Sequence, residues 1–154
     1  MCEYCGCQAL ESVRILTEEH DQVANLIGQA RSARRRDDLA SHTDHCRAIV
    51  AILGPHTRVE EDGLFPAMAA DFPNQIAALV DDQRHIDAVL ASALDGSAVS
   101  DLDWLEQVEA VFVVLREHIL REQDGVFPAA VATLTGDQWD ALDEMRRKRT
   151  PSSL

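Results

Sequence analysis

Residues 56–67 read HTRVEEDGLFPA, and residues 118–129 read HILREQDGVFPA. Histidine, glutamate, aspartate, glycine, phenylalanine, proline and alanine recur at the same places in both copies. A repeated helix-end motif would explain the phenylalanine and proline, but not the histidine and glutamate one turn upstream. We therefore predict two copies of one helical hairpin, in which the glycine and proline kink or end each helix just past its glutamate.

Apolar residues around the repeat recur at intervals of three and four, which is the spacing of one helix face. Breaks at residues 34–38, 71–74 and 95–100 divide the pattern into four stripes, and Pro73 is placed to open the third helix. Four amphipathic helices with short connections predict an all-α fold, an antiparallel up-down four-helix bundle. The stripes are Val13, Leu16, His20, Val23, Ile27 and Ala30; Leu39, His42, Cys46, Ile49, Leu53, His56 and Glu60; Ile76, Leu79, Ile86 and Leu90, with His85 at the edge; and Leu105, Val108, Phe112, Leu115, Ile119 and Glu122, with His118 beside Ile119.

The chain length of 154 residues fits one compact domain. We predict a cysteine-rich N-terminal arm over residues 1–9, the bundle over residues 10–130, and a short C-terminal helix and tail over residues 131–154. The C-terminal helix is expected to carry Trp139, Leu142 and Met145 on one face. No linker indicates a second domain.

Acidic residues outnumber basic ones by 27 to 14, and the formal net charge is −13. This charge disfavours binding to nucleic acid and to anionic membrane surfaces. No apolar run reaches the roughly 18 residues of a membrane span, and the N-terminus lacks the basic and apolar stretches of a signal peptide. We therefore expect a cytoplasmic protein without nucleic-acid or membrane partners, and the sequence does not indicate its oligomeric state.

Each repeat copy places a histidine and a glutamate four residues apart, His56 with Glu60 and His118 with Glu122. Such pairs lie on one helix face with Cβ atoms about 5–6 Å apart. Both glutamates fall on apolar stripes, where a buried carboxylate is costly and two facing carboxylates raise one another's pKa. A pair of divalent cations between them would remove that cost, and the pattern therefore predicts a metal site.

A histidine on the preceding helix completes each half of this site, His20 in the first half and His85 in the second. A single inward histidine is more often a hydrogen-bonded core residue, but the shared two-fold pattern favours ligation. Four imidazoles and two carboxylates suit Fe, Mn, Zn or Cu by ligand type. His42 and His45 lie about 16–21 Å from His56 along the helix, so we interpret them as local core or surface residues. The predicted metal ligands are His20, His56, Glu60, His85, His118 and Glu122.

The arrangement resembles the hemerythrin-like family, also called the HHE cation-binding domain, whose pattern is His, His-x-x-x-Glu, His and His-x-x-x-Glu, one element per helix. The resemblance covers roughly residues 10–130 and implies a hemerythrin-like bundle with two non-haem iron ions, oxo- or hydroxo-bridged. It also implies that Glu60 and Glu122 bridge the irons, while ligand type alone leaves Mn and Zn open. The matching elements are His20, His56 to Glu60, His85, and His118 to Glu122.

The sequence departs from the oxygen-carrying members of that family at two places. Their third helix supplies two histidines four residues apart, whereas His85 is followed four positions on by Val89. Their last carboxylate is an aspartate five residues after the final histidine, where this chain has Gln123, with Glu122 at four. One imidazole is therefore missing, which leaves room for another ligand and argues against reversible oxygen carriage.

The resemblance and the missing imidazole together favour redox chemistry with dioxygen, peroxide or nitric oxide. This chemistry could include the decomposition of peroxide and a role in oxidative stress. Two alternatives stay open: an iron- or oxygen-sensing or storage module without turnover, and a metal-stabilised bundle without small-molecule chemistry. The sequence leaves open whether the chain is an enzyme. Cys2, Cys5 and Cys7 form a thiol-rich arm that could bind a soft metal or sense redox state, or could be a disordered terminus.

Overall fold

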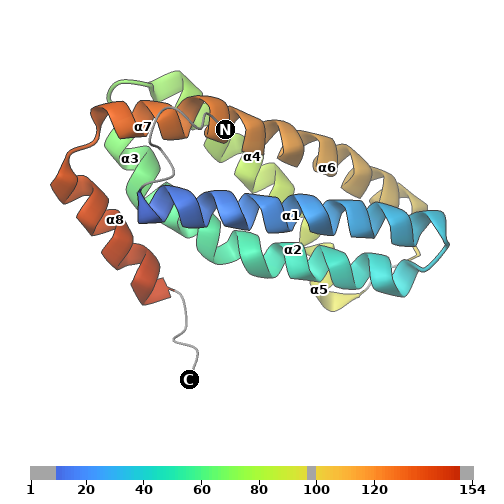
Figure 1. Cartoon of the computed structure of the whole chain (residues 1–154). Helices are drawn as coiled ribbons and strands as arrows, with labels where there is room; N and C mark the ends of the chain where they lie inside the picture. Colours follow the sequence, from blue (N-terminus) through green and yellow to red (C-terminus); the bar gives the residue numbers. More distant parts are fainter. Residues whose placement is uncertain (1–9, 97–99, 150–154) are drawn as a thin grey trace.

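The computed structural model describes residues 10–96 and 100–149, and these are helical nearly throughout, without a strand. Four long helices form the bundle: α1 (Glu11–Arg35), α2 (Leu39–Val59), α4 (Pro73–Leu90) and α6 (Leu102–Arg121). Helix α1 packs on α2 and α4 packs on α6, and contacts of α2 with α4 and of α1 with α6 close the ring. Consecutive long helices run in opposite directions (Figure 1). The predicted all-α, antiparallel four-helix bundle is confirmed.

The connections between these helices are short because local chemistry ends one helix and starts the next. Asp38 caps α2, and its side chain accepts a hydrogen bond from the backbone N–H of Ser41 at 3.1 Å. Pro73 opens α4 as predicted, since a proline at the first helical position forfeits no helix hydrogen bond. The short helix α5 (Ser92–Asp95) follows α4, and Asp101 then caps the first turn of α6.

Each helix that carries a repeat copy widens into a π-helical turn at its glutamate. The turns are η2 (Glu60–Leu64) and η3 (Glu122–Val126), and they lead into α3 (Phe65–Met68) and α7 (Phe127–Thr133). The backbone N–H of the residue after each turn donates to the carbonyl of the glutamate, five positions back. The proline that comes next has no N–H and would clash with the carbonyl four residues back in a regular α-helix. The predicted helix end is therefore corrected, because the helix continues through a wider turn of a kind that is frequent at functional sites. The kink stays a prediction, and π turns are one of its known causes.

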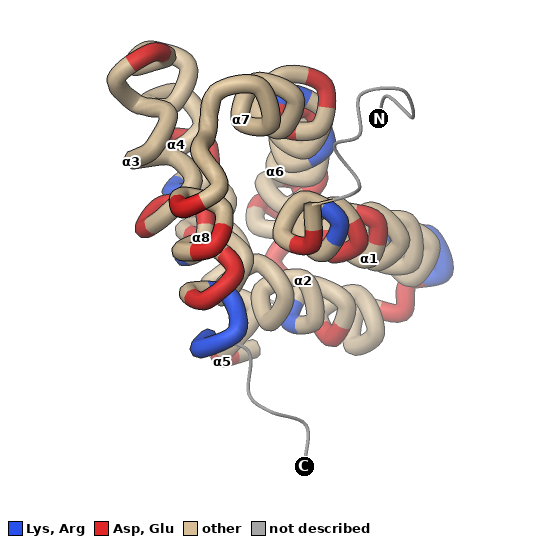
Figure 2. Tube along the Cα trace, turned by 60° about the vertical axis from the view of Figure 1, so that its left-hand side comes forward, with Lys and Arg blue, Asp and Glu red and all other residues tan. Residues whose placement is uncertain are grey.

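Helix α8 (Gly136–Arg149) lies across one end of the bundle and packs on α1, α2 and η2 (Figure 1). Trp139 and Leu142 are buried at this contact, which confirms the expected C-terminal helix and its apolar face. The last turn of α8 is basic (Figure 2), and it forms ion pairs with Glu11 of α1 and Asp62 of η2. These ion pairs fix the C-terminal helix over the first repeat copy.

The two repeat copies differ in what covers them. A Cβ atom at Gly63 would lie 2.7 Å from Leu142 Cδ2, because α8 packs directly against that turn. A Cβ atom at Gly125, the matching position, would meet nothing within 4 Å. Gly125 instead lines a mainly apolar cavity of about 570 Å³ formed with residues of α3, α4 and α7. The C-terminal helix therefore breaks the two-fold symmetry of the repeat.

Two apolar clusters fill the interior of the bundle, and a polar layer lies between them. One cluster includes Val23, Leu53, Ile86 and Leu115, and the other includes Leu16, Val59, Leu79 and Val126. Each long helix contributes one buried polar residue to the layer: His20 from α1, His56 from α2, Gln83 from α4 and His118 from α6. The flanking clusters offer no hydrogen-bond partners. The polar groups of the layer must therefore form hydrogen bonds with one another or bind an ion.

The structure bears on one of three further predictions and leaves the other two untested. No helix in the described ranges is both long and apolar enough to cross a membrane. Cys2, Cys5 and Cys7 lie outside the described residues. The boundaries of the three parts, 1–9, 10–130 and 131–154, stay predictions.

Candidate metal centre

Five of the six predicted ligands meet in the polar layer. Glu60 and Glu122 have 0% of their surface exposed, and His20, His56 and His118 are between 1% and 4% exposed. The histidines come from α1, α2 and α6, and each glutamate is the first residue of a π turn. Each glutamate thus follows the histidine of its own repeat copy by one helical turn and enters the same layer.

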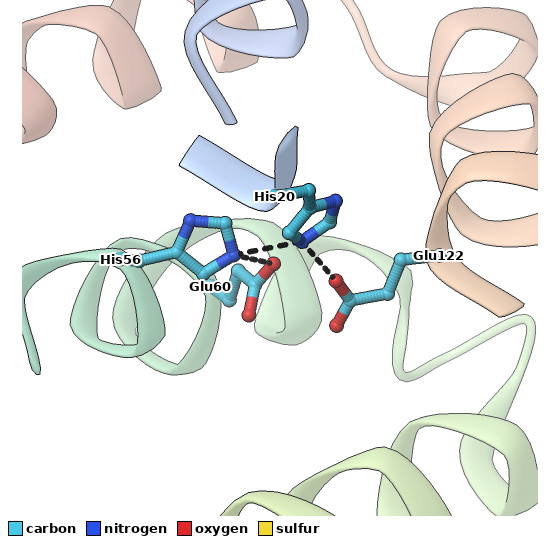
Figure 3. A group of neighbouring side chains, drawn as sticks. All are labelled: His20, His56, Glu60 and Glu122. Atoms are coloured by element: carbon cyan, nitrogen blue, oxygen red, sulfur yellow. Dashed lines mark hydrogen bonds and ion pairs between the residues drawn. The ribbon is translucent and has the colours of Figure 1, made fainter. Parts of the chain in front are cut away.

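Four ligand atoms form a compact group on one side of the layer (Figure 3), one each from His20, His56, Glu60 and Glu122, all within 4.8 Å of one another. The Nε2 atoms of His20 and His56 are 3.1 Å apart. His56 Nε2 lies 3.0 Å from Glu60 Oε1, and His20 Nε2 lies 3.0 Å from Glu122 Oε2. Two ligand atoms bound at right angles to a metal, with bonds of about 2.1 Å, are about 3 Å apart. The spacing therefore fits a single cation held by this group.

The other two carboxylate oxygens face the opposite side of the layer. Glu122 Oε1 lies 2.6 Å from His118 Nε2. Glu60 Oε2 accepts a hydrogen bond from Gln83 Nε2 at 2.6 Å. Each glutamate therefore presents one oxygen to the first group and one to the side of His118 and Gln83, as two carboxylates between neighbouring cations would.

The outer ring nitrogen of each of these histidines faces an oxygen atom. His56 Nδ1–H donates to Glu19 Oε2 at 2.6 Å, and His20 Nδ1–H donates to Gln123 Oε1 at 3.2 Å. The third histidine, on α6, has its Nδ1 atom 3.5 Å from Asp82 Oδ2. Because carboxylate and amide oxygens only accept, Glu19 and Gln123 hold a proton on the Nδ1 atoms of His56 and His20 and direct each Nε2 into the layer. Metal-binding histidines are oriented by outer partners in this way.

Burial and the charges of neighbouring groups shift the pKa values of Glu60, Glu122, His56 and His118. Burial raises the pKa of Glu60, and the charge of Glu122 raises it further. Burial would also raise the pKa of Glu122, but its interactions with His118 and His20 together outweigh burial and lower that pKa. Burial would lower the pKa of His56, but the charge of Glu60 and its other partners raise it well above the ordinary value. The metal-free centre therefore retains protons, which a cation has to displace.

Several buried atoms of the layer lack a hydrogen bond from the described residues. Glu60 Oε1 and both carboxylate oxygens of Glu122 are among them, although imidazole nitrogens lie 2.6 to 3.0 Å away. Buried carboxylate oxygens without a hydrogen bond are destabilising. A divalent cation would bind these oxygens, and imidazole with carboxylate suits Fe, Mn, Zn or Cu. The residues present thus fit a metal.

The sequence pattern of the hemerythrin HHE cation binding domain matches residues 11–130. The chain belongs to the hemerythrin HHE cation-binding family. Comparisons with curated proteins and with solved structures found no match. Membership of the family and the buried histidine–glutamate group together make the chain a metal-binding module built on a helical bundle.

The sixth predicted ligand of this hemerythrin-like domain, His85, lies outside the layer. It is exposed on α4, whereas Gln83, two residues earlier, is 4% exposed and reaches Glu60. Two positions along an α-helix are about 200° apart around the axis, so the two side chains point in nearly opposite directions. The prediction that His85 faces the interior is wrong, because α4 turns inward the face on which Gln83 lies between Leu79 and Ile86.

The metal-ligand pattern of the sequence did not include the outer partners of the histidines. Glu19 and Asp82 each stand one residue before the layer residue of their own helix, His20 and Gln83. Each faces the layer histidine of the next long helix along the chain. An acidic residue at the same position in both halves is the signal that could have identified them.

The remaining histidines lie apart from the metal centre, as predicted. His42 is buried beside Trp104, with ring centroids 5.9 Å apart, and beside Phe112. His45 is half-buried on the same helix. Burial lowers the pKa of His42 and raises the pKa of the neighbouring thiol of Cys46 to about 12. Both groups are therefore uncharged parts of the apolar core at neutral pH.

Proposed function

We propose that this hemerythrin-like domain is a non-haem di-iron protein that reacts with a small redox molecule: dioxygen, peroxide or nitric oxide. The observation that carries the proposal is the convergence of three Nε2 atoms on two buried glutamates whose oxygens face both sides of one layer. One cation beside His20 and His56 would leave Glu122 Oε1, on the other side, without a hydrogen bond or a metal, so the layer suits two. The proposed ligands are His20, His56, Glu60, His118 and Glu122.

In this proposal Glu60 and Glu122 would be shared between the two metals. His20 and His56 would hold the first metal, and His118 would hold the second. The outer partners, such as Glu19 on His56, keep each ring in the orientation that ligation requires. Bound iron would supply Lewis acidity and electrons for the reaction with the small molecule.

The shape of the interior supports a very small ligand. A cavity of about 10 Å³ adjoins the layer, and this is the space that one water-sized molecule needs. One side of the cavity is apolar, and its polar side exposes the proposed ligands. Dioxygen, nitric oxide and hydrogen peroxide belong to this size class, whereas an organic substrate would require the helices to move. The cavity is lined by the polar residues His20, His56, Thr57, Glu60, Gln83, Asp87 and His118, and by the apolar residues Leu53, Ile86, Leu115 and Ile119.

The first test is metal content, read together with peroxide turnover, on protein purified from iron-supplemented cells. We expect about two irons per chain, one for each side of the layer, and repeated turnover of peroxide. Glu60→Ala and His118→Ala should lose both metal and turnover. His85→Ala is the matched control, because His85 is an exposed histidine of the same bundle, and it should keep both. Full metal content in Glu60→Ala, or an equal loss in His85→Ala, would contradict the proposal.

The same preparation distinguishes catalysis from the other two functions. Steady turnover supports an enzyme. A single stoichiometric reaction, accompanied by a change in helix packing, would indicate a sensor or storage module instead. Inertness of the reduced iron-loaded protein toward dioxygen, peroxide and nitric oxide would indicate a metal that only stabilises the bundle.

A further inference from the structure

We infer that Gln83 makes the two metal positions unequal, so that the protein holds its first cation at least about tenfold more tightly than its second. The first position is that of His20 and His56, and the second is that of His118 and Gln83. The inference rests on the proposed metal site and adds a specificity-determining residue to it. In this inference Gln83, a carboxamide, takes the place in the layer that the family pattern gives to the third-helix histidine, His85.

Gln83 occupies on α4 the place that His20 occupies on α1. His20 lies four residues after Leu16 and three before Val23, and Gln83 lies at the same intervals from Leu79 and Ile86. In both halves the earlier apolar residue belongs to one core cluster and the later one belongs to the other. The two side chains therefore enter the layer at equivalent depths.

The contacts of the two residues match as well. His20 Nε2 lies 3.0 Å from Glu122 Oε2, and Gln83 Nε2 lies 2.6 Å from Glu60 Oε2. His20 and Gln83 thus each contact the glutamate of the other half. The two-fold pattern holds for position and contact, and it fails only for the chemistry of the side chain, an imidazole in one half and an amide in the other.

The amide oxygen of Gln83 has no hydrogen bond among the described residues. Gln83 is 4% exposed and lines the small cavity beside the layer, and its Oε1 atom is buried. A buried acceptor without a partner is destabilising. A cation on the side of His118 would satisfy this oxygen, and we assign Gln83 Oε1 as a ligand of the second position.

The two positions then differ in donor chemistry. The first combines two imidazoles with one oxygen from each glutamate. The second combines one imidazole, the other two carboxylate oxygens and a neutral amide oxygen. Imidazole suits Fe, Cu, Ni and Zn, whereas carbonyl oxygen suits Mg, Ca and Mn. The first position therefore fills first, and the second, with fewer strong protein ligands, is where a small molecule can replace one.

Stepwise titration of the metal-free full-length protein with Co²⁺, monitored by visible absorption and by competition with a chelator, tests this inference. The wild type should bind two equivalents whose affinities differ by about tenfold or more. Gln83→His should tighten the second equivalent by a similar factor and leave the first unchanged. Gln83→Leu should weaken or abolish the second equivalent alone. His85→Gln, the exposed control on the same helix, should change neither.

Two equivalents of equal affinity in the wild type would overturn the inference, and so would a Gln83→His variant whose second equivalent binds as in the wild type. Circular dichroism establishes that each variant is folded, and if Gln83→His does not fold, Gln83→Leu decides. The failure of the proposed function looks different, because the wild type would then bind no Co²⁺ in the layer. In that case His56→Ala would leave the titration unchanged.

Discussion

The ion pair between Glu19 and His56 should control how tightly the centre holds its first metal. Glu19 Oε2 lies 2.6 Å from His56 Nδ1, and its side chain is 27% exposed while that of His56 is 2% exposed. Hydrogen bonds to charged groups contribute about 1.5–3 kcal/mol net, and removal of an outer partner costs about 10- to 100-fold in metal affinity. A factor of ten corresponds to about 1.4 kcal/mol, so both sources predict the same range. Glu19→Ala should weaken the first equivalent by about 10- to 100-fold.

The control for this prediction is the adjacent carboxylate. Glu18 pairs with the exposed side chain of Arg14, at 2.7 Å and four positions away on the same helix, and such pairs contribute about 0.3–0.5 kcal/mol to stability. Glu18→Ala removes the same charge from the protein but leaves His56 oriented. Chelator competition with Co²⁺ at neutral pH measures all three affinities. A Glu19→Ala affinity within about threefold of Glu18→Ala would refute the reasoning, since outer partners act at tenfold or more.

The pH dependence of this difference has a predictable sign. Glu60 and Glu19 both raise the pKa of His56 against the effect of burial. In acid, the wild type must therefore release a proton from His56 before it binds metal, and Glu19→Ala retains that proton less strongly. The gap between wild type and Glu19→Ala should narrow as the pH falls. A gap that widens in acid would mean that Glu19 acts other than through the His56 ring.

Three further predictions concern the bundle around the centre. Gly125→Ala should raise the free energy of unfolding by about 0.4–1 kcal/mol, because alanine restricts the unfolded chain. Gly63→Ala should lower the free energy of unfolding, since overpacking against Leu142 costs about 1–3 kcal/mol. Thermal denaturation of both variants measures this contrast, and equal shifts of the two melting temperatures would contradict it. Cys46 should resist iodoacetamide at about pH 8 until the protein is denatured, because its thiol is buried and has a pKa of about 12; labelling of its peptide in the native protein would count against this. Burial lowers the pKa of His42 below its ordinary value of 6.5, so the unfolded chain takes up a proton there that the folded chain does not, and stability should fall as the pH drops below about 6.5. His42→Leu should lose less stability than the wild type between about pH 7 and pH 5, and identical urea-denaturation profiles across that range would refute this.

The helices and the two His-x-x-x-Glu pairs could be predicted because they are local properties of the chain. Apolar residues at intervals of three and four mark the buried face of a helix whatever its neighbours are. His56 with Glu60, and His118 with Glu122, share a face by spacing alone. The π turns could not be predicted in this way. Gly-x-Phe-Pro indicates that a regular helix is disturbed, but whether the chain stops or widens depends on the packing of the next segment, where Phe65 is buried in the core.

The contribution of α4 to the centre was a matter of tertiary structure. Residue type favoured His85, since histidine is a common metal ligand and glutamine is not. The stripe Ile76, Leu79, Ile86 and Leu90 nevertheless has a gap at position 83, where the interval pattern of α1 places His20. Packing against α2, α3, α5 and α6 buries the most apolar face of α4, and that face carries Gln83 while His85 lies on the exposed side. The sequence alone determined the helices and both glutamates of the layer, whereas the fourth side chain and the outer partners followed from how the helices pack.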